Sequence, residues 1–386
     1  MKKQANQETF GKDVEFLTKH TEVILLSNAS GQGQVAILPK LQGRIMTSTA
    51  GGSAGLSYGW INRQLVAAGK PVQHINPYGG EDRFWIGPEG GQFSVFFKRG
   101  APFDLEHWQT PAPVDTEAFE VVSRSLNRAL LKKEMQLENY SGTRFALRVD
   151  REIRVLERVQ AAAVLGLVCP ASVKMVAFES NNRLTNTGAT PWVKESGLLS
   201  IWILGMFNPS PATTIVVPYV AGPVLKLGPI VNDAYFGKVP ANRLQVKGRA
   251  LFFKGDGSER GKIGLSPRRA KPVLGSYDAA NQVLTIVQYT KPEGAADYVN
   301  SMWELQKNPY AGDTVNSYND GPATPGGAGL GPFYELETSS PAAALQPGAM
   351  LAHTHRTFHF EGSESDLDKI AKAVLGVSLE EIKTAL

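Results

Sequence analysis

The sequence predicts an all-β protein of many short strands that ends in a short helical tail. Short runs rich in β-branched and aromatic residues recur along the chain and have the length of strands. Most of the 39 glycines and 24 prolines lie between these runs, where turns require them. The last segment, residues 363–386, changes to a helical spacing of apolar residues. Because no period of about 20 to 50 residues recurs, a propeller or solenoid is not expected.

The expected strands follow one another from residue 22 onward. Segment 143–156 alternates apolar and polar residues, which is typical of a half-solvated antiparallel strand. Only residues 59–69 show a short helical pattern inside this region. The other expected strands lie at 22–29, 34–39, 43–49, 92–97, 173–180, 199–207, 213–219, 250–254, 282–290, 298–306, 333–339 and 353–360.

The C-terminal segment carries the signals of two helices. Ser363 or Ser365 is suited to the N-cap of the first helix, and acidic residues follow in its first turn. Gly376 interrupts the pattern, and Ser378 begins a second short helix. We expect both helices to pack on the β body.

Composition excludes several classes of protein. The chain is 42% hydrophobic and 20% charged, as in an ordinary folded soluble protein, and its net charge of +4 is dispersed. No basic stripe indicates a nucleic-acid partner. The single cysteine, Cys169, excludes an internal disulfide and a thiolate metal cluster. Its apolar run is too short for a membrane span and is stopped by Pro170.

The location of the protein stays open at this level. Residues 1–20 contain lysines but no apolar core, so they are not expected to be a signal peptide. The protein is therefore either cytoplasmic, or periplasmic or secreted in a form from which an export signal was removed. The oligomeric state is also left open.

The glycine-rich segment 74–97 is the first candidate for a ligand site. It places Arg83, Trp85 and Glu89 among glycines and prolines, which let the backbone approach a ligand closely. An indole covers an apolar sugar face while charged groups bind hydroxyls, and His74 at the start of the segment adds a polar group. The alternative is that Trp85 belongs to the core and the acids form a surface ion pair with Arg83.

Two glutamates provide a second candidate. In a strand, Glu335 and Glu337 project to the same face. If that face is solvated, they have no particular role. If it is concave, two neighbouring carboxylates raise each other's pKa, and one becomes a general acid or base.

Two further segments carry polar groups of less specific meaning. His353 and His355 share a strand face with His-x-His spacing, which is weak evidence for a metal, so we expect no metal and no cofactor. Asn316 and Asp320 lie in segment 308–322, which has the composition of a turn. Amide and carboxylate groups beside tyrosines also suit recognition of sugar hydroxyls.

The segment from Leu336 onward is similar to the end of the galactose mutarotase (aldose 1-epimerase) superfamily. Its "LET" strand, its "Leu-x-Pro-Gly" turn at 345–348 and its final strand with Thr357 and Phe360 match in order and spacing. The whole chain also resembles a bacterial family of unknown function. The resemblance implies a β-supersandwich over residues 15–362, with 1–14 as an N-terminal extension and 363–386 as a helical tail. It also implies that Glu337 is the base that takes the anomeric proton.

One position departs from the family pattern. In mutarotases a histidine protonates the ring oxygen, in a "His-x-x-Phe" stretch shortly after an "Asn-x-Gly" turn. Here the turn is "TNTGATPW" at 185–192, and the following strand, "GLLSIWILGMF" at 197–207, has no histidine. This chain therefore has a residue at the family's base position, Glu337, but no histidine at its acid position. We therefore expect slow mutarotation of simple aldoses together with preserved sugar binding.

The sequence thus predicts binding of a small carbohydrate in a concave β-sheet pocket. The alternative is an aldose epimerase or a related enzyme with Glu337 as base, and with Glu335 or a histidine such as His355 as acid. A glycoside hydrolase is a third reading, and it would need two carboxyl groups about 5 to 9 Å apart. The residues expected to bind the sugar are His74, Arg83, Trp85, Glu89, Asn316, Asp320 and His353.

Overall fold

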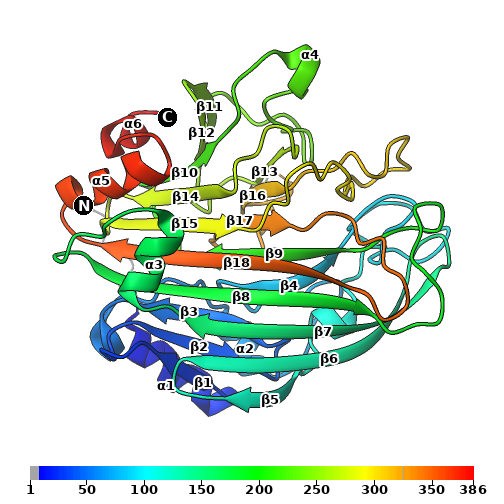
Figure 1. Cartoon of the computed structure of the whole chain (residues 1–386), viewed down its shortest axis with the longest axis horizontal. Helices are drawn as coiled ribbons and strands as arrows, with labels where there is room; N and C mark the ends of the chain where they lie inside the picture. Colours follow the sequence, from blue (N-terminus) through cyan, green and yellow to red (C-terminus); the bar gives the residue numbers. More distant parts are fainter. Residues whose placement is uncertain (1–7, 325) are drawn as a thin grey trace.

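The protein is built around two antiparallel β-sheets that pack face to face (Figure 1). This is a computed structural model, and it describes residues 8–324 and 326–386. The larger sheet has ten strands in the order β11 (Leu244–Lys247), β12 (Ala250–Lys254), β10 (Thr213–Pro218), β14 (Val273–Asp278), β15 (Val283–Tyr289), β18 (Met350–Glu361), β8 (Lys174–Asn186), β7 (Arg144–Val155), β6 (Arg128–Glu138) and β5 (Glu120–Arg124).

The second sheet has five strands and positions the candidate site. Its order is β13 (Gly261–Leu265), β16 (Val315–Asn319), β17 (Tyr334–Ser339), β9 (Ser200–Phe207) and β4 (Arg83–Gly87). A third, three-stranded sheet contains β1 (Ile24–Ser27), β2 (Gln34–Leu38) and β3 (Arg44–Thr49). The fold class is therefore the predicted all-β sandwich.

Strand alternation separates the two faces of the five-stranded sheet. On β17, Leu336 is buried in the apolar core between the large sheets, whereas Glu335 and Glu337 point to the opposite face. On β4, Phe84 packs inward, and Arg83 lines a cavity on the outer side. The apolar residues of this sheet thus bury one face against the ten-stranded sheet, and its charged residues occupy the other.

Short helices cover the ends of the sandwich. α3 (Arg158–Leu165), α5 (Glu364–Val374) and α6 (Leu379–Lys383) share an apolar cluster with the outer face of the ten-stranded sheet. The side chains of Ser363 and Ser378 accept hydrogen bonds from backbone N–H groups of their helices, which confirms both predicted N-caps. The remaining helical elements are α1 (Phe10–His20), α2 (Arg63–Ala68), α4 (Val224–Leu227), η1 (Gly52–Ala54) and η2 (Ala112–Val114).

Several sequence predictions of local structure are wrong. Residues 92–97 and 298–306 contain no strand, because both segments form loops held by side-chain bonds such as Gln92 Nε2 to the Gln306 carbonyl, 2.8 Å. The glycine-rich segment includes strand β4, and the segment read as a turn, 308–322, includes strand β16. Pairing with β9 and β17, respectively, overrides the local turn composition in both cases.

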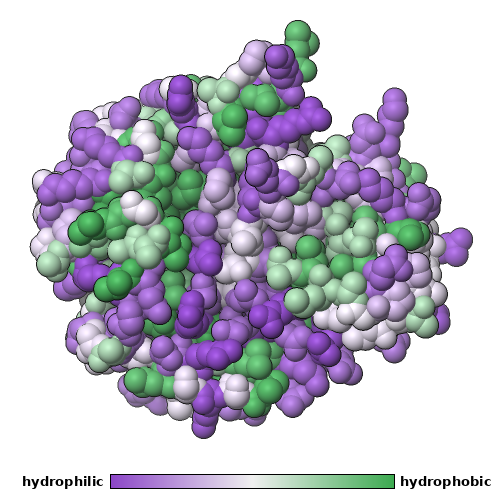
Figure 2. Space-filling model, in the orientation of Figure 1, coloured by the Kyte–Doolittle hydropathy of each residue, from purple (hydrophilic) through white to green (hydrophobic). Residues whose placement is uncertain are grey.

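The division of the chain at residues 14 and 362 remains a prediction. Helix α1 spans the first boundary, and residues 1–7 of the proposed N-terminal extension lie outside the described residues. Among the described residues, no helix is long and apolar enough to cross a membrane. An arm between β10 and β11 projects from the body and ends at α4, where Leu225 is exposed (Figures 1 and 2).

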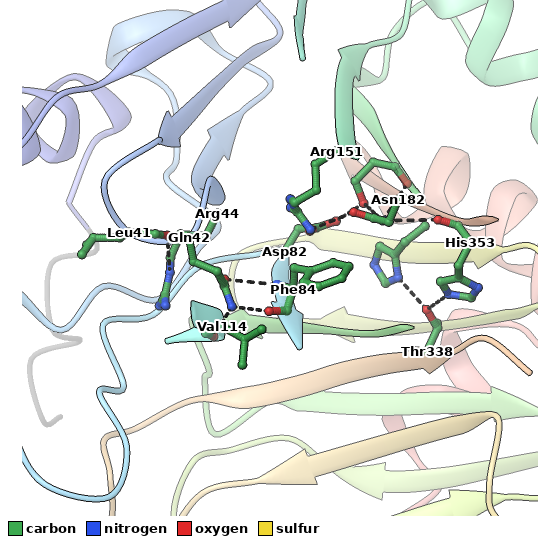
Figure 3. A network of polar contacts seen from close by, with 12 residues as sticks. Leu41, Gln42, Arg44, Asp82, Phe84, Val114, Arg151, Asn182, Thr338 and His353 are labelled. Atoms are coloured by element: carbon green, nitrogen blue, oxygen red, sulfur yellow. Dashed lines mark hydrogen bonds and ion pairs between the residues drawn. The ribbon is translucent and has the colours of Figure 1, made fainter. Parts of the chain in front are cut away.

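A belt of buried polar side chains crosses the space between the sheets (Figure 3). Arg151 on β7 donates to Asp82 at 2.7 Å and to Asn182 at 2.8 Å, and all three are fully buried. Gln42 donates to two backbone carbonyls, those of Phe84 and Val114. These bonds satisfy groups that would be costly to bury unpaired, and they tie the sheets to each other.

Candidate functional site

A cavity of about 730 Å³ lies against the outer face of the five-stranded sheet. This volume is in the range of small-molecule sites. Every strand of the sheet contributes to its floor. The floor residues are Arg83 and Trp85 from β4, Trp202, Leu204 and Met206 from β9, Glu335 from β17, Tyr318 from β16 and Lys262 from β13.

The register of the sheet brings the charged and aromatic floor residues together. Glu335 pairs across the ladder with Tyr318 on one side and Met206 on the other. Lys262 pairs with Tyr318, and Trp85 pairs with Trp202. Because directly paired residues share a face, the floor forms one continuous surface.

Four of the six tryptophans of the chain line the cavity. Trp85 contacts Trp202 with ring centroids 5.4 Å apart, and Trp108 contacts Trp303 at 5.6 Å. Trp85 is also 3% exposed, so it belongs to the aromatic core and to the cavity wall at once. Flat indole faces of this kind suit a ligand with an apolar ring face and polar edges.

A cluster of charged groups lies on and beneath the cavity floor. Arg83 forms an ion pair with Glu335, and both side chains are buried. Lys262 Nζ lies 3.3 Å from Glu337 Oε2, and the Trp202 indole N–H donates to the same oxygen at 2.9 Å. Glu337 is fully buried and does not line the cavity itself; it contacts it through Lys262 and Trp202. Its other oxygen, Oε1, has no hydrogen-bond partner among the described residues.

Burial and neighbouring charges shift the protonation of this cluster. Burial raises the pKa of Glu89 to about 7, against the opposing effect of Lys262. Burial and the nearby Glu337 also raise the pKa of Glu335, although Arg83 acts in the other direction. Burial opposes the charge of Lys262, but Glu337, Glu89 and Glu335 together raise its pKa. The cavity thus holds a protonated lysine beside Glu89, a carboxyl group that is partly protonated near neutral pH.

The structure brings six of the sequence-predicted site residues to one cavity. They are His74, Arg83, Trp85, Glu89, Asp320 and Glu335. The His74 ring is held by a 2.7 Å bond between Nδ1 and the Trp108 carbonyl. Asp320 accepts from the Tyr318 hydroxyl at 2.8 Å and from the Gly331 N–H at 2.9 Å.

The other four predicted residues lie elsewhere. Glu337 is beneath the floor, and Asn316 lines a separate chamber of about 10 Å³, where its amide donates to the Tyr235 hydroxyl at 3.1 Å. His353 and His355 are buried between the sheets, and both contact the Thr338 hydroxyl (Figure 3). Neither histidine lines the cavity. The reason is strand alternation: Thr338 points to the core, opposite to Glu337.

Sequence reasoning missed several cavity residues. These residues line the cavity and come from four separate segments of the chain: Lys262, Arg260, Trp108, Trp202 and Trp303. Lys262 lies in an unremarkable glycine-flanked stretch, and Trp202 in a strand that reads as continuous core. Because the chain has only six tryptophans, their positions were the one sequence signal that could have pointed to these cavity residues.

A metal centre finds no support in the described part of the chain. No group of three or more histidine, cysteine, aspartate or glutamate side chains is arranged there as metal ligands. His353 and His355 instead share one hydroxyl between them.

The fold is similar to that of galactose mutarotase-like proteins. The Slr1438 protein of Synechocystis sp. PCC 6803 has a similar structure, with a TM-score of 0.51 and 12% identity over 89% of this chain and 96% of that protein. A galactose mutarotase-like protein of Lactobacillus casei ATCC 334 has a TM-score of 0.51 and 10% identity over 88% of this chain and 100% of that protein. At these identities the likeness shows the fold.

The sequence places the chain in a particular family. It belongs to the Family of unknown function (DUF6786), whose model matches residues 8–386. No curated protein is similar to it in sequence.

Proposed function

We propose that this protein binds a carbohydrate in the cavity on the five-stranded sheet. The observation that carries the proposal is the lining, which combines four indoles with ion-paired side chains. Indoles cover the apolar faces of sugar rings, and fixed carboxyl and cationic groups hydrogen-bond their hydroxyls. The galactose mutarotase-like fold supports the same class of ligand.

The proposal is tested by removing one indole. Trp303 lines the cavity from a loop outside the strands and is only partly buried, so we expect its replacement to leave the sheets intact. We expect Trp303→Ala to weaken sugar binding by roughly tenfold to a hundredfold, because the buried face of an aromatic side chain contributes about 1.5–3 kcal/mol. Isothermal titration calorimetry with a panel of aldoses and sugar acids measures this change.

The matched control for Trp303→Ala is Leu305→Ala. Leu305 lies on the same loop, is 69% exposed and does not line the cavity. Its replacement is expected to leave the affinity unchanged. Equal loss in both variants, or no heat and no thermal shift with any sugar in the wild type, would remove the carbohydrate proposal.

Acid–base catalysis on the bound sugar is a second candidate function. It is favoured by Glu89 and Glu335, which line the cavity and whose pKa values are raised toward neutral pH. Such groups transfer protons efficiently near pH 7. In this candidate Glu335 and Glu89 act in place of Glu337, because Glu337 does not line the cavity.

Polarimetry separates the two candidates. If the protein only binds its sugar, we expect freshly dissolved α-aldoses to mutarotate no faster with the protein than in buffer. A positioned acid–base pair would accelerate the reaction by about 10²–10⁴-fold. An acceleration that Glu335→Gln abolishes while binding persists would establish the enzyme and overturn the expectation of binding alone.

A further inference from the structure

We propose that the sugar bound in the cavity carries a carboxylate, as a uronic acid does, and that Arg260 recognises it. This inference rests on the proposed carbohydrate-binding function and names the chemical class of its ligand. Three cations line the cavity: Arg83, Lys262 and Arg260.

Two of these cations are already neutralised by the protein. Arg83 forms an ion pair with Glu335, and Lys262 forms one with Glu337. Their charges are needed to compensate buried carboxylates, since a buried ion without a partner is costly. Neither cation is therefore available to balance a charge on a ligand without giving up its own partner.

Arg260 differs from both. Among the residues that the structure describes, its guanidinium forms no ion pair and no side-chain hydrogen bond. Its charge acts on Glu89 only as a minor effect that lowers the pKa of that carboxyl. Asp320, which also lines the cavity, accepts hydrogen bonds from the Tyr318 hydroxyl and the Gly331 N–H. The five donors of Arg260 are thus left for a ligand.

The position of Arg260 is nevertheless fixed. Its guanidinium carbon lies 3.7 Å from the centroid of the Phe236 ring, and the residue is partly buried. Phe236 in turn contacts Tyr318 edge-on, with ring centroids 6.0 Å apart. All three line the cavity. Stacking on Phe236 holds the planar guanidinium of Arg260 at the cavity wall and leaves the N–H donors at its edge available to a ligand acceptor.

The charge balance favours a carboxylate over a phosphate. Arg260 is the one lining cation without an ion pair among the described residues, and a carboxylate brings a single negative charge to it, whereas a phosphate monoester brings about −1.5 to −2 near pH 7. The cavity is also lined by the carboxyl side chains of Glu89, Glu106 and Asp320, which disfavour additional negative charge. A guanidinium binds a carboxylate with two parallel hydrogen bonds, which fixes the orientation of the sugar.

The test compares matched sugars by titration calorimetry at fixed salt. We expect D-glucuronate or D-galacturonate to bind roughly tenfold to a hundredfold more tightly than D-glucose or D-galactose. Arg260→Gln is expected to remove this preference while leaving binding of the neutral sugar within about twofold. Arg260→Lys keeps the positive charge but loses the planar pair of N–H donors, so it is expected to retain only part of the preference for the acidic sugar.

Arg268→Gln is the matched control, because Arg268 is an exposed arginine that does not line the cavity, and its loss changes the net charge equally. It should leave the preference intact. Equal affinity for neutral and acidic sugars would overturn the inference and leave the proposed function standing. Tighter binding of glucose 6-phosphate than of either uronate would overturn the assignment of a carboxylate. Absence of binding to all these sugars would instead count against the proposed function itself.

Discussion

Replacing Lys262 with methionine is expected to lower the free energy of unfolding by about 3–5 kcal/mol at pH 7.5. The replacement leaves the carboxylate of Glu337 fully buried without its cation, and only the Trp202 indole N–H then remains as a partner. The cost of an unpaired buried charge exceeds the small loss of packing, because methionine has nearly the volume of the lysine stem. Urea unfolding followed by tryptophan fluorescence measures the change.

Two further variants show whether the ion pair is the cause. Lys262→Met/Glu337→Gln removes both charges, and the glutamine oxygen can still accept from Trp202, so we expect most of the stability to return. Lys19→Met breaks an exposed pair with Glu15 and should cost no more than about 1 kcal/mol. A loss in Lys262→Met as small as that in Lys19→Met would show that Glu337 does not need its cation.

The second large effect concerns the buried histidines. Burial lowers the pKa of His353 to about 3 and that of His355 to about 4, from an ordinary value of 6.5. Below pH 6.5 the unfolded chain binds protons that the folded protein does not, so stability is lost as the pH falls from 6.5 toward the folded values. Between pH 7.5 and pH 5 the two histidines together lower the free energy of unfolding by about 4 kcal/mol.

The effect is isolated by comparison with His353→Gln/His355→Gln. We expect the loss of stability between pH 7.5 and 5 to be about 4 kcal/mol smaller in this variant than in the wild type, measured by urea unfolding at both values. Glu89 and Glu335 act in the opposite direction, since raised carboxyl pKa values favour the folded protein at lower pH, but they are common to both proteins and cancel in the difference.

An exposed histidine provides the control for this comparison. His107 lies at the surface, beside Asp104, so His107→Gln is expected to leave the pH dependence of the wild type almost unchanged. The same pH dependence in the wild type and in the double variant would contradict neutral burial of His353 and His355.

The fold was predictable because its signals are local and repeated. Alternating residues in β7, β-branched runs in β10 and β15, and serine N-caps in the tail each follow from the chain over a few residues. The missed and misplaced elements have a common physical cause. β16 is short and rich in polar residues, and β4 is a short strand flanked by glycines; both are strands because neighbouring strands satisfy their backbone groups.

The candidate site was predictable only in part. The shared face of Glu335 and Glu337 followed from strand period, and the composition of segment 74–97 pointed to Arg83, Trp85 and Glu89. The sequence did not predict that Glu335 lines the cavity and Glu337 does not. That difference depends on Lys262 and Trp202, which come from other strands and contact Glu337. The histidines of β18 were predicted near the sugar, yet their strand lies in the other sheet with their side chains between the layers.

By itself, then, the sequence determined an all-β sandwich with a helical tail and a face that carries two carboxyl groups. The tertiary structure decided which groups meet. Lys262 reaches Glu337, and Arg260 stacks on Phe236 without an acidic partner among the described residues, only because strands and loops distant in the chain are brought to one sheet face. Local periodicity specifies the face on which a side chain projects; ion pairing and cavity lining depend on register across β13, β16, β17, β9 and β4, which no single segment encodes.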